Sequence, residues 1–527
     1  MKSPHLPQAF SIALVVMMMG CFLYVGNKGI NFGYHWDEWL TIDAAAKSMK
    51  TKVFSPPLYD HPGMAYDLAV FAAGLFPLVH PHTDLESLGF RLWARRFFLA
   101  ASSLTILWVF LIGLWTPGGS AIKGLIAAAI LTGSWEFGYH SRWGMSDTLM
   151  AQFTALTMLG LTLAWERPPR MIRWLLASVS AGMACGAKTP AGILVFLVVG
   201  LCFAQAFGRS QETRLFWKIW TSLQNPLLCS AIFAATFLIT TPWALLNFHK
   251  FAFDTTVVSR AYANGVHGME NYFAVGLLSH LEKILQYLSL SALSPFPPLA
   301  LCLFLLGMMG CLDWAYLAVS RRNFQTWGHV VLWIGYPTIY LMYFSFQKLM
   351  VVRNFMVILP FLALLSAHGL LLFVKFLTTS LTLRHTIFVP VIAGLLIGSG
   401  FVVNELWLNH AADTIVQYRP GQLSPIPKDL LYRRIWLAPS LRSLYRDHPG
   451  IVQRREDADL ILFQLADLID GTGIAMKANV FNNYHLFPAG PWDVNFNYYP
   501  TWSGPMRPIW VTRQFAQSAG LLNGLRS

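Results

Sequence analysis

Two adjacent carboxylates, Asp37 and Glu38, stand between tryptophans in "HWDEW", shortly after an apolar run near the N-terminus. Their neighbours Trp36 and Trp39 are of the type that favours a lipid–water boundary. A carboxylate beside aromatic rings in such a place can have a raised pKa and accept a proton. The stretch is therefore a candidate functional site, in which Glu38 is expected to be a structural partner rather than the reacting carboxylate.

Further acids and bases fall in short segments at the ends of apolar runs. Charges at membrane depth are costly and are candidates for function by default. The segments are "LYDHPG" with Asp60 and His61, "EFGYHSRWGMSDTL" with Glu136, His140, Arg142 and Asp147, "CGAKTP" with Lys188, and "FQKLMVVRNF" with Lys348 and Arg353.

Each of these residues also has a plain structural interpretation. Asp147 and Asp37 could cap helices, and Lys348 and Arg353 could bind lipid headgroups. Asp and His are common in turns that precede a proline, as at His61. The functional interpretation depends on all of them reaching the same face of a membrane.

The composition sets the class of protein. The chain has 527 residues, of which 55% are hydrophobic and only 12% charged, whereas a soluble chain is about 25% charged. The sequence therefore predicts an integral membrane protein, and its net charge of +13 is no sign of nucleic-acid binding, because basic residues gather in cytoplasmic loops of such proteins. The six cysteines lie in or beside apolar runs and are expected to be buried thiols.

A spanning helix needs about 20 mostly apolar residues. The N-terminal run lacks a small-residue cleavage site and is taken as an uncleaved first span. Eleven predicted spans cover roughly residues 9–26, 96–115, 119–138, 148–165, 172–187, 190–207, 226–247, 297–318, 328–346, 354–376 and 385–405.

The loops predict an orientation. Short loops such as "ERPPRMIR" and "SRRNFQ" are rich in Lys and Arg, so they and the N-terminus are placed in the cytoplasm. The long segments 27–95 and 248–296 and the tail from about 406 then lie outside. We expect a transmembrane domain over 1–405 and an extracytoplasmic domain over 406–527.

The long outer segments carry secondary-structure signals. "DEWLTIDAAAKSMK" and "GMAYDLAVFAAGLFPLVH" are amphipathic at helical spacing, which predicts two interfacial helices in the first outer loop. In the tail, "DLLYRRIWLAPSLRSLYRD" has helical periodicity, "ADLILFQLADL" begins as a strand, and "YYPTWSGPMRPIWVTR" predicts turns followed by a strand. The fold class is thus an all-α polytopic membrane protein with a small mixed α/β C-terminal domain.

The order of these motifs resembles the C-type glycosyltransferase superfamily, called GT-C. An acidic pair follows the first span, "SRWGMSD" precedes the fourth, and "GAKTP" and "QKLMVVRNFMVILP" come later. The likeness covers about residues 1–405 and is with the branch of protein O-mannosyltransferases and lipid A aminoarabinose transferases. "DHPG" departs from the "HPP" of many relatives, so His61 receives no catalytic role.

The resemblance implies transfer of a sugar from a polyprenyl-phosphate-linked donor to a hydroxyl of a glycan, lipid or protein, with inversion. The phosphate leaving group needs cations rather than a proton donor. The resemblance implies that Asp37, the first acid of the pair, is the general base that takes the acceptor proton. The catalytic set is then Asp37, Glu38 and Asp147; the donor phosphate set is Arg142, Lys188, Lys348 and Arg353; and the sugar or acceptor contacts are Trp36, Trp39, Tyr59, His61 and Tyr139.

Several alternatives stay open at this stage. No cofactor is required, although Asp37, Glu38 and Asp147 could hold a divalent cation. A transporter or flippase of lipid-linked sugars competes with the transferase, but the sequence has no internal repeat of the kind transporters show. A membrane scaffold would leave the charged residues unexplained. The chain contains no Asn-x-Ser/Thr sequon, which favours the bacterial inner membrane.

Overall fold

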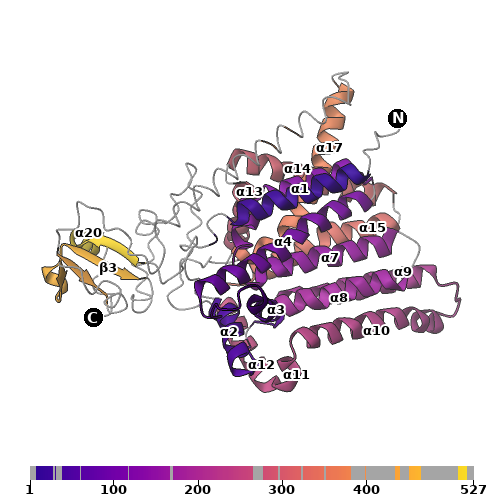
Figure 1. Cartoon of the computed structure of the whole chain (residues 1–527). Helices are drawn as coiled ribbons and strands as arrows, with labels where there is room; N and C mark the ends of the chain where they lie inside the picture. Colours follow the sequence, from indigo (N-terminus) through magenta and orange to yellow (C-terminus); the bar gives the residue numbers. More distant parts are fainter. Residues whose placement is uncertain are drawn as a thin grey trace.

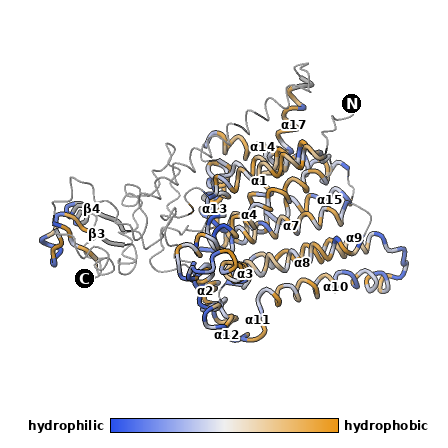
Figure 2. The backbone as a smooth tube through the Cα atoms, viewed as in Figure 1, coloured by the Kyte–Doolittle hydropathy of each residue, from blue (hydrophilic) through white to orange (hydrophobic). Residues whose placement is uncertain are grey.

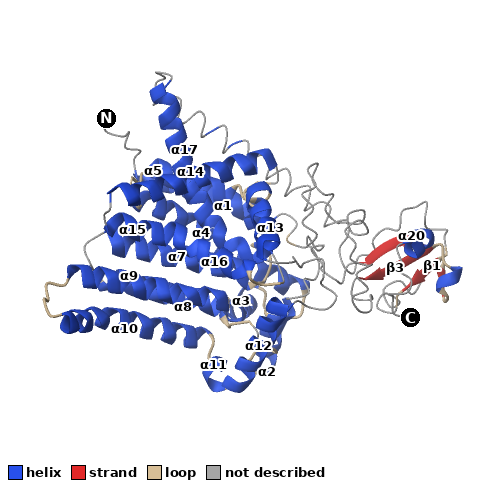
Figure 3. Ribbon diagram, turned by 180° about the vertical axis from the view of Figure 1, so that it is seen from behind, coloured by secondary structure: helices blue, strands red, loops and turns tan. Residues whose placement is uncertain are grey.

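The fold is known from a computed structural model, in which helices predominate (Figures 1 and 3). Long helices run side by side in a bundle, and a small sheet forms near the C-terminus. The structure describes residues 8–27, 30, 38–59, 61–116, 118–166, 170–264, 277–294, 297–321, 324–348, 352–380, 394, 398, 434–438, 450–464 and 508–518.

The bundle confirms a multi-pass membrane protein. Within the described residues, seven segments are long and apolar enough to cross a membrane. Three more helices are apolar but shorter: Met64–Val79, Ala121–Thr132 and Met171–Ala187. The seven are found in α1 (Gln8–Asn27), α4 (Leu88–Trp115), α7 (Ser146–Glu166), η2 (Thr189–Ile193) with α9 (Leu194–Arg209), α10 (Leu215–Thr240), α14 (Pro297–Arg321), and η5 (Val352–Ile358) with α17 (Leu359–Ser380).

The predicted third span, 119–138, is two helices rather than one. α5 (Ala121–Thr132) ends at Gly133, and α6 (Trp135–His140) begins after Ser134. The Ser134 side chain accepts a hydrogen bond from the Phe137 backbone N–H and donates one to the Ala292 carbonyl at 2.8 Å. This N-cap starts a new helix, although the apolar pattern runs on without interruption.

Two other predicted spans have different outcomes. Residues 328–346 form a continuous helical path through α15 (Phe324–Val330), a π-helical turn η4 (Val331–Gly335) and α16 (Tyr336–Ser345). The last predicted span, 385–405, lies almost wholly outside the described residues, so the total of eleven stays a prediction.

Helix α7 forms the centre of the bundle. It packs against α4 and α8 (Met171–Ala187), and 89% of its apolar window is buried. At its last residue, Glu166 bonds His329 of α15, and the Trp165 indole donates to the Gln325 carbonyl at 2.9 Å. The C-terminal end of α7 is thus held by polar contacts as well as by packing.

Glycines allow other helices to approach closely. A Cβ on Gly369 would lie 1.8 Å from the Leu306 carbonyl oxygen, and one on Gly310 would lie 2.5 Å from the Leu365 carbonyl oxygen. The backbones of α14 and α17 therefore touch, an approach that only small residues permit in membrane bundles.

The long connections gather at one end of the bundle. α2 (Ile42–Thr51), α3 (Met64–Val79), α12 (Phe248–Asn264) and α13 (Leu277–Leu290) lie there, away from the turn that joins α9 to α10 (Figure 1). Polar residues are frequent at that end, and apolar residues dominate the long helices (Figure 2). The helices α2 and α3 confirm the two helices predicted in the first long loop, and the Tyr66 hydroxyl donates to the Ser48 hydroxyl at 2.7 Å across them.

The C-terminal region contains a four-stranded sheet in the order β2-β1-β3-β4. β1 (Ile435–Leu437) pairs in parallel with β2 (Ile451–Val452) and with β3 (Leu460–Gln464), and β3 pairs antiparallel with β4 (Pro508–Thr512). The strands predicted at β3 and β4 are confirmed. The helix predicted around "RIWLA" is wrong at β1, because this segment is buried between two parallel neighbours and their pairing overrides its helical periodicity.

Candidate active site

Asp147 is the centre of an ionic cluster at the end of the bundle that carries the long loops. It lies in the first turn of α7, where its Oδ1 is 2.5 Å from the Lys188 Nζ and its Oδ2 is 3.8 Å from the Arg353 Nε. Lys188 is the C-cap of α8, and Arg353 lies in η5. Three segments that are distant in sequence therefore bring one carboxylate and two cations together.

Among the described residues, this cluster contains two cations and one carboxylate, and it has some access to solvent. The exposed fractions of the side chains are 5% for Asp147, 12% for Lys188 and 15% for Arg353. Two cations in a partly desolvated setting interact strongly with a phosphate.

Neutral polar groups complete the cluster, and they were not among the predicted site residues. The Lys188 ammonium donates to the Asn354 Oδ1 at 2.5 Å, and Asn354 is fully buried. The Asn354 Nδ2 donates to the Tyr262 hydroxyl at 3.2 Å, and the Tyr340 hydroxyl donates to the Asn354 carbonyl at 2.9 Å. A search for ionisable residues does not find an amide, although "VVRNF" places Asn354 directly after Arg353.

Glu38 makes a different kind of ion pair. Its Oε1 and Oε2 accept from the Arg95 Nε at 2.8 Å and Nη2 at 2.6 Å, and both side chains are 0% exposed. Oε1 also accepts from the Gly144 backbone N–H at 3.2 Å, and the Arg95 Nη1 donates to the Ile30 carbonyl at 2.8 Å. Glu38 thus ties the first long loop to α4 and to the turn before α7.

The partner of Glu38 was not predicted. Arg95 is 57 residues away in sequence, and it begins a span rather than standing in a recognisable motif. Asp37 and Trp36 lie outside the described residues, so the base assigned to Asp37 stays a prediction.

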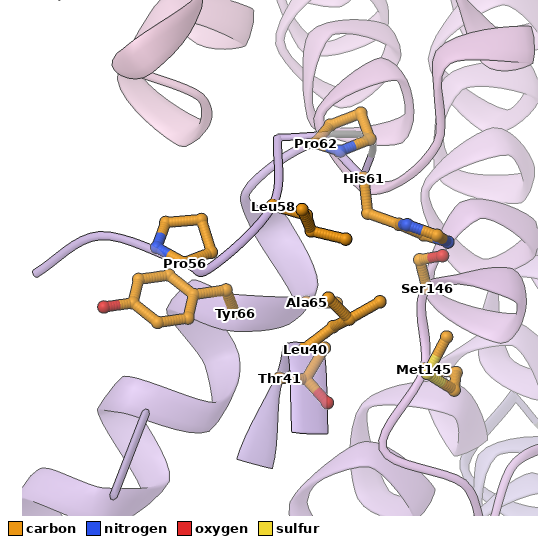
Figure 4. Close-up of a pocket in the computed structure, with 10 residues that line it drawn as sticks. All are labelled: Leu40, Thr41, Pro56, Leu58, His61, Pro62, Ala65, Tyr66, Met145 and Ser146. Carbon is orange, nitrogen blue, oxygen red and sulfur yellow. The ribbon is translucent and has the colours of Figure 1, made fainter. Parts of the chain in front are cut away.

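A small pocket lies where the first long loop meets the start of α7 (Figure 4). The His61 ring points toward the Ser146 hydroxyl, and Ser146 directly precedes Asp147. The ten residues that line the pocket are Leu40, Thr41, Pro56, Leu58, His61, Pro62, Ala65, Tyr66, Met145 and Ser146. The loop that carries "HWDEW" is therefore adjacent to the Asp147 cluster.

The second long loop is joined to the first through Tyr59. The Tyr59 ring stacks on Trp243 with centroids 5.5 Å apart, and its backbone N–H donates to the Asp254 Oδ2 at 2.8 Å. The Lys250 Nζ lies 2.5 Å from the same oxygen and 4.4 Å from the Tyr59 ring centroid. Burial opposes ionisation of Asp254, but the hydrogen bonds from Lys250 and Tyr59 outweigh it and hold the pKa below the usual value.

Two of the four predicted phosphate ligands meet at Asp147, and the other two are placed differently. Arg142 is fully buried and donates to the Val25 carbonyl at 3.1 Å, at the end of α1. Lys348 is exposed, and its backbone N–H donates to the Tyr262 carbonyl at 2.8 Å. The cations that share a partner are therefore Lys188 and Arg353.

The predicted sugar contacts also separate into packed and accessible residues. Tyr139 is 1% exposed among Trp135, His140 and Trp143, and His140 pairs with Glu136 at 3.1 Å. Trp39 is 39% exposed and can receive a ligand.

Within the part of the chain that the structure describes, no three His, Cys, Asp or Glu side chains gather as a metal site. Asp37 belonged to the predicted metal set and lies outside that part, so the divalent cation stays an open alternative.

Comparisons with known proteins agree with this architecture. The family described as dolichyl-phosphate-mannose-protein mannosyltransferase matches residues 64–257, which run from α3 into α12. No curated relative matches the chain in sequence. The family match and the fold agree with the resemblance noted in the sequence: this is a multi-pass membrane protein with a GT-C-like fold.

The chain is also similar in fold to proteins of known structure. The chain is similar to ArnT from Cupriavidus metallidurans bound to undecaprenyl phosphate, with a TM-score of 0.50 and 11% identity, over 95% of this chain and 98% of that one. An oligosaccharyltransferase from Archaeoglobus fulgidus, in a complex with Zn and sulfate, has a TM-score of 0.48 and 12% identity, over 88% and 69% of the two chains. At these identities the likeness to ArnT concerns the fold.

Proposed function

We propose that this protein transfers a sugar from a polyprenyl-phosphate-linked donor to an acceptor hydroxyl, at the end of the bundle where the long loops gather. The observation that carries the proposal is the Asp147–Lys188–Arg353 cluster, in which two partly exposed cations lie beside one carboxylate. A GT-C fold supports this assignment, as does the undecaprenyl phosphate in the structure of the similar ArnT.

The cations act on the leaving group. As the bond between the anomeric carbon and the phosphate oxygen breaks, negative charge grows on the phosphate, and Lys188 and Arg353 stabilise it. Arg353 can bind two phosphate oxygens through its planar fork, whereas Lys188 acts as a compact charge. Asp147 keeps both cations in place before the donor arrives.

The carboxylates act on the acceptor. In our proposal Asp37 takes the proton of the acceptor hydroxyl as its oxygen bonds to the anomeric carbon, and Asp147 orients the acceptor or a neighbouring cation. Electrons of the breaking bond go to the phosphate. A single displacement without a covalent sugar–enzyme intermediate inverts the anomeric centre. Glu38, adjacent to Asp37, fixes the position of this part of the loop through Arg95.

The cellular setting is part of the proposal. We place the N-terminus in the cytoplasm of a bacterium and the long loops and C-terminal domain in the periplasm, because the short loops are basic. Thiols introduced in the 250–264 segment should react with an impermeant reagent added from outside, whereas a thiol at Arg321 should not. Labelling at Arg321 from outside would reverse the assignment of sides.

A transfer assay tests the function. The purified protein in lipid nanodiscs is incubated with a panel of radiolabelled polyprenyl-phosphate sugars and with candidate glycan, lipid and peptide acceptors. Release of polyprenyl phosphate that depends on Lys188 and Arg353 is the expected result. If labelled donor crosses proteoliposome membranes intact, and no donor is ever cleaved, the chain is a transporter and the proposal fails.

A further inference from the structure

Among the residues that the structure describes, the Lys188 ammonium has two protein partners, and a lysine has three N–H donors. One N–H is directed at the Asp147 Oδ1 and another at the Asn354 Oδ1, each at 2.5 Å. Two fixed bonds on a tetrahedral nitrogen also fix the direction of the third. The side chain of Lys188 is otherwise flexible, so these two acceptors decide where its remaining donor points.

The amide of Asn354 must face Lys188 with its oxygen. Its NH₂ end would repel an ammonium, and the two ends of an amide have nearly the same shape. The Tyr262 hydroxyl contacts both ends of this amide: it accepts from the Asn354 Nδ2 at 3.2 Å, and it lies 3.4 Å from the Asn354 Oδ1, to which it can donate. The shorter contact is the one with the NH₂ end, so Tyr262 holds the amide in place beside Lys188. The backbone of Asn354 is held as well, by the Tyr340 hydroxyl on its carbonyl at 2.9 Å.

Tyr262 comes from α12, in the second long loop. Its backbone carbonyl accepts from the Lys348 N–H at 2.8 Å, and its ring packs edge-on against Phe344, with centroids 6.2 Å apart. These contacts attach the end of α12 to the segment that leads into η5. The second long loop therefore reaches the donor cluster through one hydroxyl group.

We propose that Asn354 and Tyr262 are positioning residues that aim the third N–H of Lys188 at the donor phosphate; this rests on the proposed function. Asn354 is suited to the task because an amide orients the ammonium without adding a negative charge to the site. A carboxylate at the same position would orient Lys188 equally well, but its negative charge would oppose binding of a phosphate.

The test measures binding of undecaprenyl phosphate to the full-length protein in nanodiscs, together with the KM and kcat for the donor. For Asn354→Ala we expect binding about tenfold weaker, since a hydrogen bond to a charged group is lost. For Tyr262→Phe we expect a loss of about threefold. Asn354→Asp should weaken binding more than Asn354→Ala, and all three should raise KM more than they lower kcat.

The control is Tyr343→Phe. Tyr343 lies in α16 near Tyr262, and its hydroxyl makes no hydrogen bond within the described residues. Melting temperatures of all variants, measured in the same nanodiscs, distinguish destabilisation of the fold from loss of the orientation of the Lys188 ammonium. Binding and KM of the control should equal those of the wild type.

A double-mutant cycle decides between a positioning and a structural role. If Asn354 acts through Lys188, Asn354→Ala should cause no further loss of binding in a Lys188→Ala background. Full additivity of the two losses, or an Asn354→Asp variant that binds as well as the wild type, would overturn the positioning role. If the wild type neither binds undecaprenyl phosphate nor transfers any sugar, the proposed function itself falls, and the positioning role falls with it.

Discussion

Glu38 and Asp147 are both acidic residues near the long loops, but the two form opposite kinds of ion pair. Glu38 has one arginine and a backbone N–H around it, and neither side chain of the Glu38–Arg95 pair reaches solvent. Asp147 has two cations that are partly exposed and exceed it in charge. A closed, neutral pair stabilises a fold, whereas an open cluster with surplus charge can accept a ligand. Burial and charge balance thus distinguish two residues that the sequence presents alike.

Breaking the closed pair should have the largest effect. Arg95→Ala leaves Glu38 buried without its cation, which should reduce the free energy of unfolding by about 3–5 kcal/mol. Thermal unfolding in nanodiscs measures it. The control is Arg91→Ala, one turn earlier in α4, whose pair with Asp43 at 2.8 Å is partly exposed and should contribute less than about 1 kcal/mol. Equal losses for the two arginines would show that burial does not distinguish these pairs.

The next largest effect is expected at Asp37, which precedes Glu38 in the sequence. Asp37→Asn keeps the shape and removes the base, so turnover should fall by about 10²-fold or more while donor binding survives. Glu38→Gln should reduce turnover less, because Glu38 acts on the fold. Should Asp37→Asn retain near-full turnover at an unchanged protein level, Asp147 becomes the candidate base.

Opening the cluster further should weaken donor binding. Lys188→Ala and Arg353→Ala should each cost about 1.5–3 kcal/mol of binding free energy, the range for a hydrogen bond to a charged group. Titration with undecaprenyl phosphate provides the measurement. Lys348→Ala is the matched comparison, since this lysine is exposed and screened by salt. A loss at Lys348 as large as that at Lys188 would return Lys348 to the phosphate site.

Salt should produce the smallest difference. Raising the ionic strength from about 0.05 M to about 0.5 M should weaken donor binding by about threefold, because the cluster is partly exposed and ions screen it. The difference in unfolding free energy between Arg95→Ala and the wild type should stay the same over this range of ionic strength, because the Glu38–Arg95 pair is fully buried. A salt-dependent difference in unfolding would mean that water reaches this pair.

Much of the fold could be predicted from hydropathy, and the exceptions depend on contacts between residues that are distant in the sequence. The Gly133–Ser134 break interrupts an apolar run without changing its composition, and the strand β1 forms only because β2 and β3 lie beside it. Both features depend on contacts with distant residues, such as the carbonyl of Ala292. A pattern of neighbouring residues does not contain that information.

The candidate site was predictable to the extent that its residues are charged. Asp147, Lys188 and Arg353 stand out because a charge near a span is costly. Asn354 and Tyr262 are neutral, and their importance comes from the direction of their hydrogen bonds to Lys188 and to one another. Arg95 is charged, but it directly precedes the predicted span 96–115, where an arginine is commonly an anchor. Only the fold reveals that Glu38 meets it.

Helix α7 carries Asp147 in its first turn and Glu166 at its last residue, and each is bound by partners from other helices. The helix is therefore fixed in both rotation and axial position. One inserted residue would turn one end by about 100° relative to the other and move it by about 1.5 Å along the axis. No single shift of the helix can restore both sets of contacts. The contacts at the two ends therefore constrain the number of residues between Asp147 and Glu166. We expect insertions and deletions in this stretch of α7 to be tolerated less than most substitutions.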